Sequence, residues 1–172
     1  QMYTYLLDTY NENDLTYDSF NKGKLESQLA YDGNYKAYFE FIADSLKRYS
    51  SQRDKQKGEA FVHGFTLAMT SQNQFYRPIS ELDNDGSYAD IFLSPLCDIY
   101  KDMVDSYIIE LKYCKTNTAD EQLQVLFKEA SAQICRYANS DIVKESVKTT
   151  KLHKLVVIYR GAEMVMCEEV TE

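Results

Sequence analysis

The most regular hydrophobic pattern begins after Asn34. Apolar side chains recur there with helical spacing, at Tyr35, Tyr38, Phe39, Ile42, Leu46 and Tyr49. This spacing predicts an amphipathic helix with Asn34 as its N-cap. A second helix is predicted from about residue 55 to residue 70, where Val62, Phe65 and Met69 share one stripe. Residues 1–32 have weak periodicity and predict only a short extended piece and a helical turn.

Runs of β-branched and aromatic residues between turn signals predict five strands. They cover residues 75–82, 88–93, 106–113, 153–159 and 163–167. Pro78 interrupts the first strand, and the Asn-Asp-Gly sequence at residues 84–86 predicts a turn after it. A second turn, at residues 160–162, joins the last two strands.

A third amphipathic helix is predicted between the third and fourth strands. Thr118 and Glu121 have the spacing of a capping box, so the helix is expected to begin at Thr118. Its apolar stripe contains Leu123, Leu126, Phe127, Ala130, Ile134 and Tyr137. The predicted order of elements is therefore α, α, β, β, β, α, β, β. This order predicts an α/β fold in which helices flank a mixed sheet of four or five strands.

Composition narrows the class of protein. With 172 residues, 44% of them hydrophobic and 27% charged, the chain is long enough for one domain of ordinary size. We expect no membrane span, because no apolar run is long enough, and no signal peptide. Its four cysteines are far apart, which predicts reduced thiols and a cytoplasmic protein. An N-terminal Gln1 leads us to expect a fragment of a longer chain.

The net charge of −8 argues against a surface that coats nucleic acid broadly. Basic residues nevertheless gather in two segments, 47–57 and 144–154. A basic face formed by both segments around a catalytic site would favour a substrate-binding enzyme. Lysines scattered over the surface would favour a module without catalytic activity.

Candidate chemistry lies in the strand at residues 106–113. Because side chains alternate along a strand, Glu110 and Lys112 share one face with Ile108. Antiparallel pairing with the preceding strand can bring Asp90 beside Glu110. Two carboxylates, with the Leu111 carbonyl, offer the oxygen ligands that Mg²⁺ or Mn²⁺ prefers. With Lys112 orienting a water molecule, this set predicts hydrolysis of a phosphodiester.

These residues resemble the core motif of the PD-(D/E)XK nuclease superfamily. Asp90 is followed after nineteen residues by Glu110-Leu111-Lys112, although Ala89 stands where the motif's nominal proline would be. The resemblance implies a restriction-endonuclease-like core of the form α-β-β-β-α-β. It also implies an additional acidic metal ligand at Glu59. Residues Gln133 and Tyr137 resemble the Q-x-x-x-Y motif of RecB-type members, which implies that they position the substrate.

Residues 55–168 most resemble a bacterial branch of this superfamily in which the nuclease-like domain follows an AAA-type ATPase-like domain. This implies a helical connecting region at residues 1–52 and a nuclease-like domain at residues 53–172. The implied partners are DNA or RNA and an ATPase-like domain in the same polypeptide.

Each flanking residue also has a structural interpretation. Glu59 could interact favourably with the helix dipole from the first turn of its helix. His63 lies on the same face of that helix and could be a partly buried histidine whose hydrogen bonds are satisfied. Gln133 could cap backbone groups, and Tyr137 could belong to the core. For the whole domain, the alternative is a catalytically inactive nuclease-fold module that mediates nucleic-acid or protein interactions for an attached ATPase-like domain.

Overall fold

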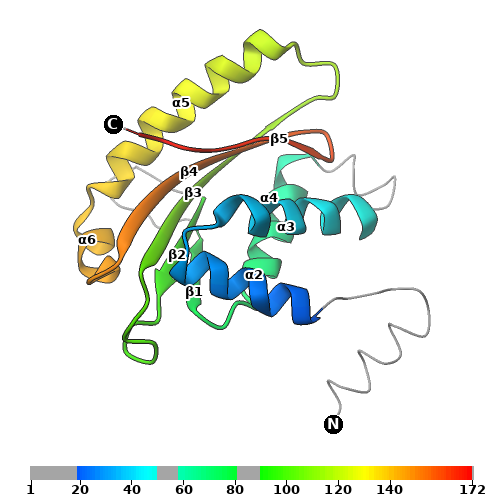
Figure 1. Cartoon of the computed structure of the whole chain (residues 1–172). Helices are drawn as coiled ribbons and strands as arrows, with labels where there is room; N and C mark the ends of the chain where they lie inside the picture. The colour runs from blue at the N-terminus through cyan, green and yellow to red at the C-terminus, as the bar shows by residue number, and fades with distance from the viewer. Residues whose placement is uncertain (1–18, 50–57, 81–89, 172) are drawn as a thin grey trace.

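The computed structural model describes residues 19–49, 58–80 and 90–171. Its centre is a five-stranded sheet in the order β1-β2-β3-β4-β5 (Figure 1). The strands are β1 (Tyr76–Ser80), β2 (Ile91–Pro95), β3 (Asp105–Cys114), β4 (Lys151–Arg160) and β5 (Glu163–Glu169). β3 and β4 run parallel and the other neighbours antiparallel, so the sheet is mixed, as predicted.

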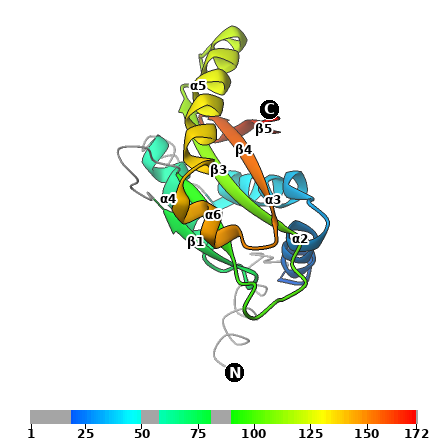
Figure 2. The same cartoon turned by 90° about the vertical axis from the view of Figure 1, so that its left-hand side faces the viewer.

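Helices cover both faces of this sheet. One face carries α2 (Ser19–Tyr31), α3 (Tyr35–Tyr49) and α4 (Glu59–Thr70). The other face carries α5 (Asp120–Ala138) and α6 (Asp141–Val147), which connect β3 to the parallel β4. Figure 1 shows these two helix layers on opposite sides of the strands, and Figure 2 turns the α5–α6 side towards the viewer. The predicted α/β architecture is therefore confirmed.

Alternating side chains of β3 supply both halves of the core. Tyr107, Ile109 and Leu111 pack in the cluster that α2, α3 and α4 complete. Ile108 points the other way and packs with Ile134 of α5. The predicted alternation along this strand is confirmed, and it places Glu110 and Lys112 on the side of α5.

The N-terminal helices belong to the same core as the sheet. The predicted helix after Asn34 is present as α3, with Tyr38, Phe39, Ile42 and Leu46 buried. The second predicted helix is present as α4, which begins at Glu59. Residues 50–57 of the basic segment 47–57 lie outside the described residues, as do residues 81–89 with their predicted turn. None of the described helices is both long and apolar enough to cross a membrane.

The structure corrects the expectation for the described part of residues 1–32, because α2 is a 13-residue helix rather than a helical turn, whereas residues 1–18 lie outside the described residues. The pattern missed it because part of its inward face is ionic. Lys22 and Glu26 are both buried and form an i,i+4 ion pair. The Lys22 Nζ also donates a hydrogen bond to the Gln72 backbone oxygen at 3.2 Å. A buried ion pair replaces the apolar residues by which such a helix is usually identified.

The predicted capping box at Thr118 is wrong. The helix α5 begins at Asp120, and its N-cap residue, Ala119, makes no side-chain capping bond. A side-chain cap occurs instead at α6, a helix that the sequence pattern did not predict. There the Ser140 Oγ accepts a hydrogen bond from the Val143 N–H at 3.4 Å. α6 has 7 residues, too few for its apolar spacing to be recognised.

Replacing Ser140 with alanine should lower the free energy of unfolding by about 1 kcal/mol, because the α6 N-terminus loses its cap. Chemical denaturation followed by circular dichroism measures this change. The matched control is Thr118→Ala, which removes a hydroxyl near a helix start that has no side-chain cap. Its expected effect is within about 0.5 kcal/mol. Equal losses in the two variants would contradict the assignment of the cap to Ser140.

Candidate active site

Asp90 is held against the middle of β3. It directly precedes β2, whose first ladder pair joins Ile91 to Ile109 of the antiparallel neighbour β3. Its Oδ2 accepts a hydrogen bond from the Leu111 N–H at 2.7 Å. The expected pairing of the strands therefore brings Asp90 beside Glu110. The Leu111 N–H is a contact that the sequence did not indicate, because only the carbonyl of that residue entered the prediction.

Glu110 and Lys112 form an ion pair on the side of the sheet that α5 covers. The Lys112 Nζ lies 2.8 Å from the Glu110 Oε1. It also donates to the Gln133 Oε1 at 3.4 Å, so α5 contributes to the same group. The Glu110 side chain is 0% exposed, whereas that of Lys112 is 22% exposed. The cluster is thus buried at the glutamate and open to solvent at the lysine.

Burial has shifted the proton affinities of these groups. Burial, together with the negative charge of Asp90, raises the pKa of Glu110 to about 7, although Lys112 acts in the opposite direction. Burial also raises the pKa of Asp90, against the hydrogen bond from Leu111. For Lys112, burial acts to lower the pKa, but the hydrogen bond and charge of Glu110 raise it above its ordinary value. Ionising both carboxylates is therefore costly without a cation.

The helix α4 brings two further predicted residues near Asp90. Glu59 is exposed in its first turn, and its negative charge helps to raise the pKa of Asp90 after burial, the larger cause. His63 is half-buried one turn later. Its Nε2 lies 3.1 Å from the Asp90 backbone oxygen and 3.3 Å from the Ser80 Oγ. The expectation of a satisfied, partly buried histidine is confirmed, whereas no periodicity in the sequence indicated Ser80.

Comparison with protein-family models matches residues 57–169 to the PD-(D/E)XK nuclease superfamily. The chain belongs to this superfamily. The match covers the sheet and the helices α4, α5 and α6, and the mixed sheet with flanking helices agrees with the restriction-endonuclease-like fold of its members. Comparisons with curated proteins and with solved structures gave no match.

The two residues of the Q-x-x-x-Y motif occupy different environments in this PD-(D/E)XK domain. Gln133 is half-buried and contacts Lys112. Tyr137 is 1% exposed and packs with Phe92 and Ile108. Its hydroxyl is buried and has no hydrogen-bond partner. The motif therefore joins the site at Gln133, whereas the Tyr137 ring lies in the core beneath it.

The chemistry of the donors fits a hard divalent cation. The Glu110 Oε2 is buried and has no hydrogen-bond partner, so one carboxylate oxygen remains available. Oxygen donors from Asp90 and Glu110 suit Mg²⁺ or Mn²⁺, and a cation there would offset the cost of ionising both groups. Among residues 19–49, 58–80 and 90–171, no three or more His, Cys, Asp or Glu side chains are grouped so as to hold a metal ion. The fit therefore rests on this pair of carboxylates with backbone oxygen.

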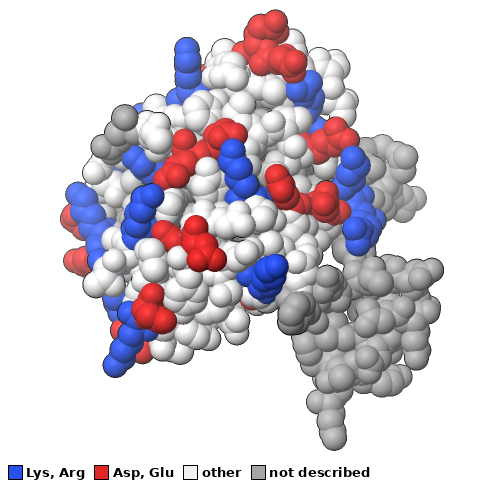
Figure 3. Space-filling model, viewed as in Figure 1, with Lys and Arg blue, Asp and Glu red and all other residues white. Residues whose placement is uncertain are grey.

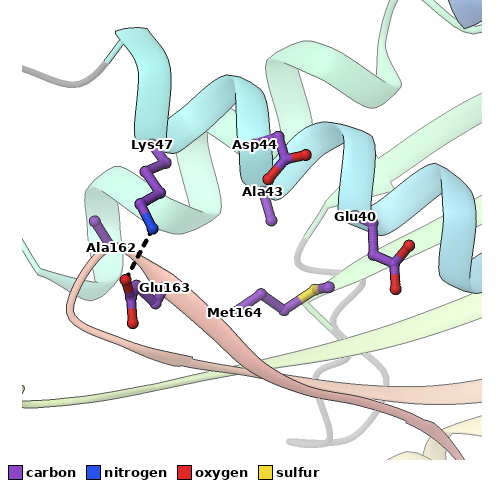
Figure 4. Close-up of a pocket in the computed structure, with 7 residues that line it drawn as sticks. All are labelled: Glu40, Ala43, Asp44, Lys47, Ala162, Glu163 and Met164. Carbon is purple, nitrogen blue, oxygen red and sulfur yellow. Dashed lines mark hydrogen bonds and ion pairs between the residues drawn. The ribbon is translucent and has the colours of Figure 1, made fainter.

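A hollow of about 410 Å³ lies elsewhere, between α3 and β5 (Figure 4). Its lining is mostly charged and small: Glu40, Ala43, Asp44, Lys47, Ala162, Glu163 and Met164. An ion pair between Lys47 and Glu163 crosses its rim. Because α3 covers the face of the sheet opposite α5, this hollow is separate from the Asp90–Lys112 cluster.

Acidic and basic side chains are interspersed on the face drawn in Figure 3. Lys47 pairs with Glu163, and Lys148 pairs with Asp98. These described members of the two basic segments are thus balanced by acids. The Lys112 ammonium contributes positive charge at the candidate site itself.

Proposed function

We propose that this domain hydrolyses phosphodiester bonds of nucleic acid with Mg²⁺ or Mn²⁺ as cofactor. The observation that carries the proposal is the cluster of Asp90, Glu110 and Lys112, in which a buried glutamate oxygen lacks a partner. Such a cluster is costly to keep in a protein interior for structural reasons alone. Membership of the PD-(D/E)XK nuclease superfamily supports the same chemistry.

Asp90 and Glu110 would hold the metal with the Leu111 carbonyl. Glu59, at the start of α4, is proposed as a further ligand on the resemblance alone, because the structure does not group its carboxylate with the other two. When bound, the metal supplies a Lewis acid for a phosphoryl oxygen and lowers the pKa of bound water. Lys112, whose Nζ lies at the open end of the cluster, orients the attacking water and offsets the charge that develops on the phosphate. Gln133 holds Lys112 from α5 and would position the substrate, whereas Tyr137, whose ring is buried, would act only indirectly, by fixing α5 against the sheet.

Asp90→Asn should remove most of the metal affinity, because it neutralises one of the two clustered carboxylates while preserving its shape. Calorimetric titration with Mn²⁺ and Mg²⁺ measures the affinity, and parallel assays on single- and double-stranded DNA and on RNA measure cleavage. We expect wild-type protein to bind and cleave, and Asp90→Asn to lose both.

The control for this experiment is Asp44→Asn, which changes an exposed aspartate of α3 on the opposite side of the sheet. It should bind metal and cleave as the wild type does. Absence of metal binding by the wild type would contradict the proposed function. It would instead favour the alternative, a catalytically inactive nuclease-fold module that mediates interactions.

The wider setting follows from the resemblance of residues 55–168 to the branch that carries an AAA-type ATPase-like domain. We propose that such a domain precedes the nuclease-like domain, whose limits we place at residues 53–172. Residues 1–52 would connect the two domains, and within this region α2 and α3 pack directly on the sheet. The proposed substrate is DNA or RNA, and the proposed location is the cytoplasm.

A further inference from the structure

His63 contacts the backbone of the residue that carries the first carboxylate. It projects from α4, and its Nε2 lies 3.1 Å from the backbone oxygen of Asp90. The same nitrogen lies 3.3 Å from the Oγ of Ser80, the last residue of β1. One imidazole nitrogen therefore contacts both the end of β1 and the residue that precedes β2.

The acceptor determines where the imidazole proton lies. A backbone carbonyl can only accept, so the Nε2 atom of His63 must carry a hydrogen to bond Asp90. A protonated ring nitrogen has no lone pair for a metal ion. In this arrangement Nε2 therefore acts as a hydrogen-bond donor to the main chain and does not act as a ligand.

Asp90 is held from two directions. Its side chain is held by the Leu111 N–H at 2.7 Å, and its main chain is held by His63. The residue lies just before β2, whose first ladder pairs begin at Ile91. The hydrogen bond from His63 thus restrains the backbone one residue beyond the regular pairing. Because the Cα–Cβ direction follows the backbone, this bond also sets where the carboxylate points.

We propose that His63 is a positioning residue for Asp90, acting through the main-chain carbonyl as a hydrogen-bond donor. Its significance for catalysis rests on the proposed function, because only a metal-binding Asp90 needs a defined carboxylate direction. Donors that orient a ligand typically change metal affinity about 10- to 100-fold when they are removed. The role requires an N–H at the position of Nε2 and no other property of imidazole.

The variants His63→Leu and His63→Gln separate the N–H donor from the other properties of the imidazole ring. Leucine removes the donor, whereas glutamine can place an amide N–H near the same carbonyl. The control is Thr66→Ala, because Thr66 lies on the same helix, is buried, and bonds the Val62 oxygen at 2.8 Å. The Thr66→Ala substitution damages the packing of α4 without changing a contact of Asp90, so it shows what a general loss of packing in this helix does to each readout.

The first readout is amide hydrogen exchange at Leu111 in the metal-free full chain. In His63→Leu the Leu111 amide should exchange about tenfold faster relative to the Ile109 amide, because Asp90 no longer holds it steadily. His63→Gln and Thr66→Ala should keep the wild-type ratio. An unchanged ratio in His63→Leu overturns the proposal, whether or not the protein binds metal.

The second readout is the Mn²⁺ affinity of the same variants. We expect a loss of about 10- to 100-fold in His63→Leu and restoration to within about threefold in His63→Gln. Unchanged affinity in His63→Leu overturns the proposal, as does a nitrogen coupling from the His63 imidazole in the electron spin-echo spectrum of bound Mn²⁺. If the wild type binds no Mn²⁺, the proposed function fails, and the exchange at Leu111 still decides the role of His63.

Discussion

Glu110→Gln is expected to abolish cleavage and, at the same time, to make the metal-free protein more stable. Cleavage should fall at least about 10³-fold, since loss of a metal-held transition state costs several kcal/mol and each 1.4 kcal/mol is about tenfold. Stability should rise because burial, with the charge of Asp90, raises the pKa of Glu110 to about 7. A neutral amide of the same shape avoids that cost.

The gain in stability should depend on pH. Folded protein holds a proton on Glu110 up to a pKa of about 7, whereas the ordinary value is 4.5. The folded state therefore binds the proton more tightly than the unfolded chain does, and the wild type loses stability as pH rises from 4.5 to 7. The Glu110→Gln variant does not lose stability in this way, because glutamine does not ionise. Denaturation curves of the two proteins should differ little at pH 4, and by roughly 2–3 kcal/mol at pH 8.

The control for this prediction is Glu129→Gln, which changes an exposed glutamate of α5. It should leave both cleavage and the pH dependence of stability unchanged. A Glu110→Gln variant that is less stable than the wild type at pH 8 would show that the ion pair with Lys112 outweighs burial. That result would remove the electrostatic argument for a cation at this position.

The fold could be predicted where side-chain pattern and burial agree. The strand β3 is such a case, because its alternation placed Ile108 and Ile109 on opposite faces and the structure has them there. The helix α2 is the opposite case, because Lys22 and Glu26 occupy inward positions as an ion pair. Hydrophobic periodicity cannot detect a helix whose buried face is satisfied by paired charges.

Only the part of the candidate site that depends on side-chain alternation in β3 and on its pairing with β2 could be predicted from the sequence. The spacing on β3 put Glu110 and Lys112 side by side, and antiparallel pairing brought Asp90 next to them. The contact of His63 with Ser80 joins a helix to a strand end seventeen residues away. Such contacts depend on how α4 docks on the sheet, which no local spacing encodes.

Lys112→Met should change stability in the opposite direction from Glu110→Gln. The Glu110 carboxylate would lose the cation that lies 2.8 Å away and would be left buried without compensation. We expect a loss of about 1–2 kcal/mol at pH 8, because Lys112 is 22% exposed and because a carboxyl group with a pKa of about 7 can take up a proton at pH 8 for about 1.4 kcal/mol. The loss should shrink below pH 6, where Glu110 takes up a proton and needs no partner. Denaturation at several pH values measures both effects.

The same variant separates metal binding from catalysis. Lys112 offers no lone pair while it is protonated, so Mn²⁺ affinity should be retained, or should increase once a neighbouring positive charge is gone. Cleavage should nevertheless fall about 10²- to 10³-fold, the usual cost of removing one charge-stabilising donor.

The double variant Glu110→Gln/Lys112→Met should regain most of the stability that Lys112→Met loses, because neither charge is left buried alone. A double variant that is no more stable than Lys112→Met, or loss of metal binding in Lys112→Met, would contradict the division of roles in which Glu110 binds the metal and Lys112 acts on the water.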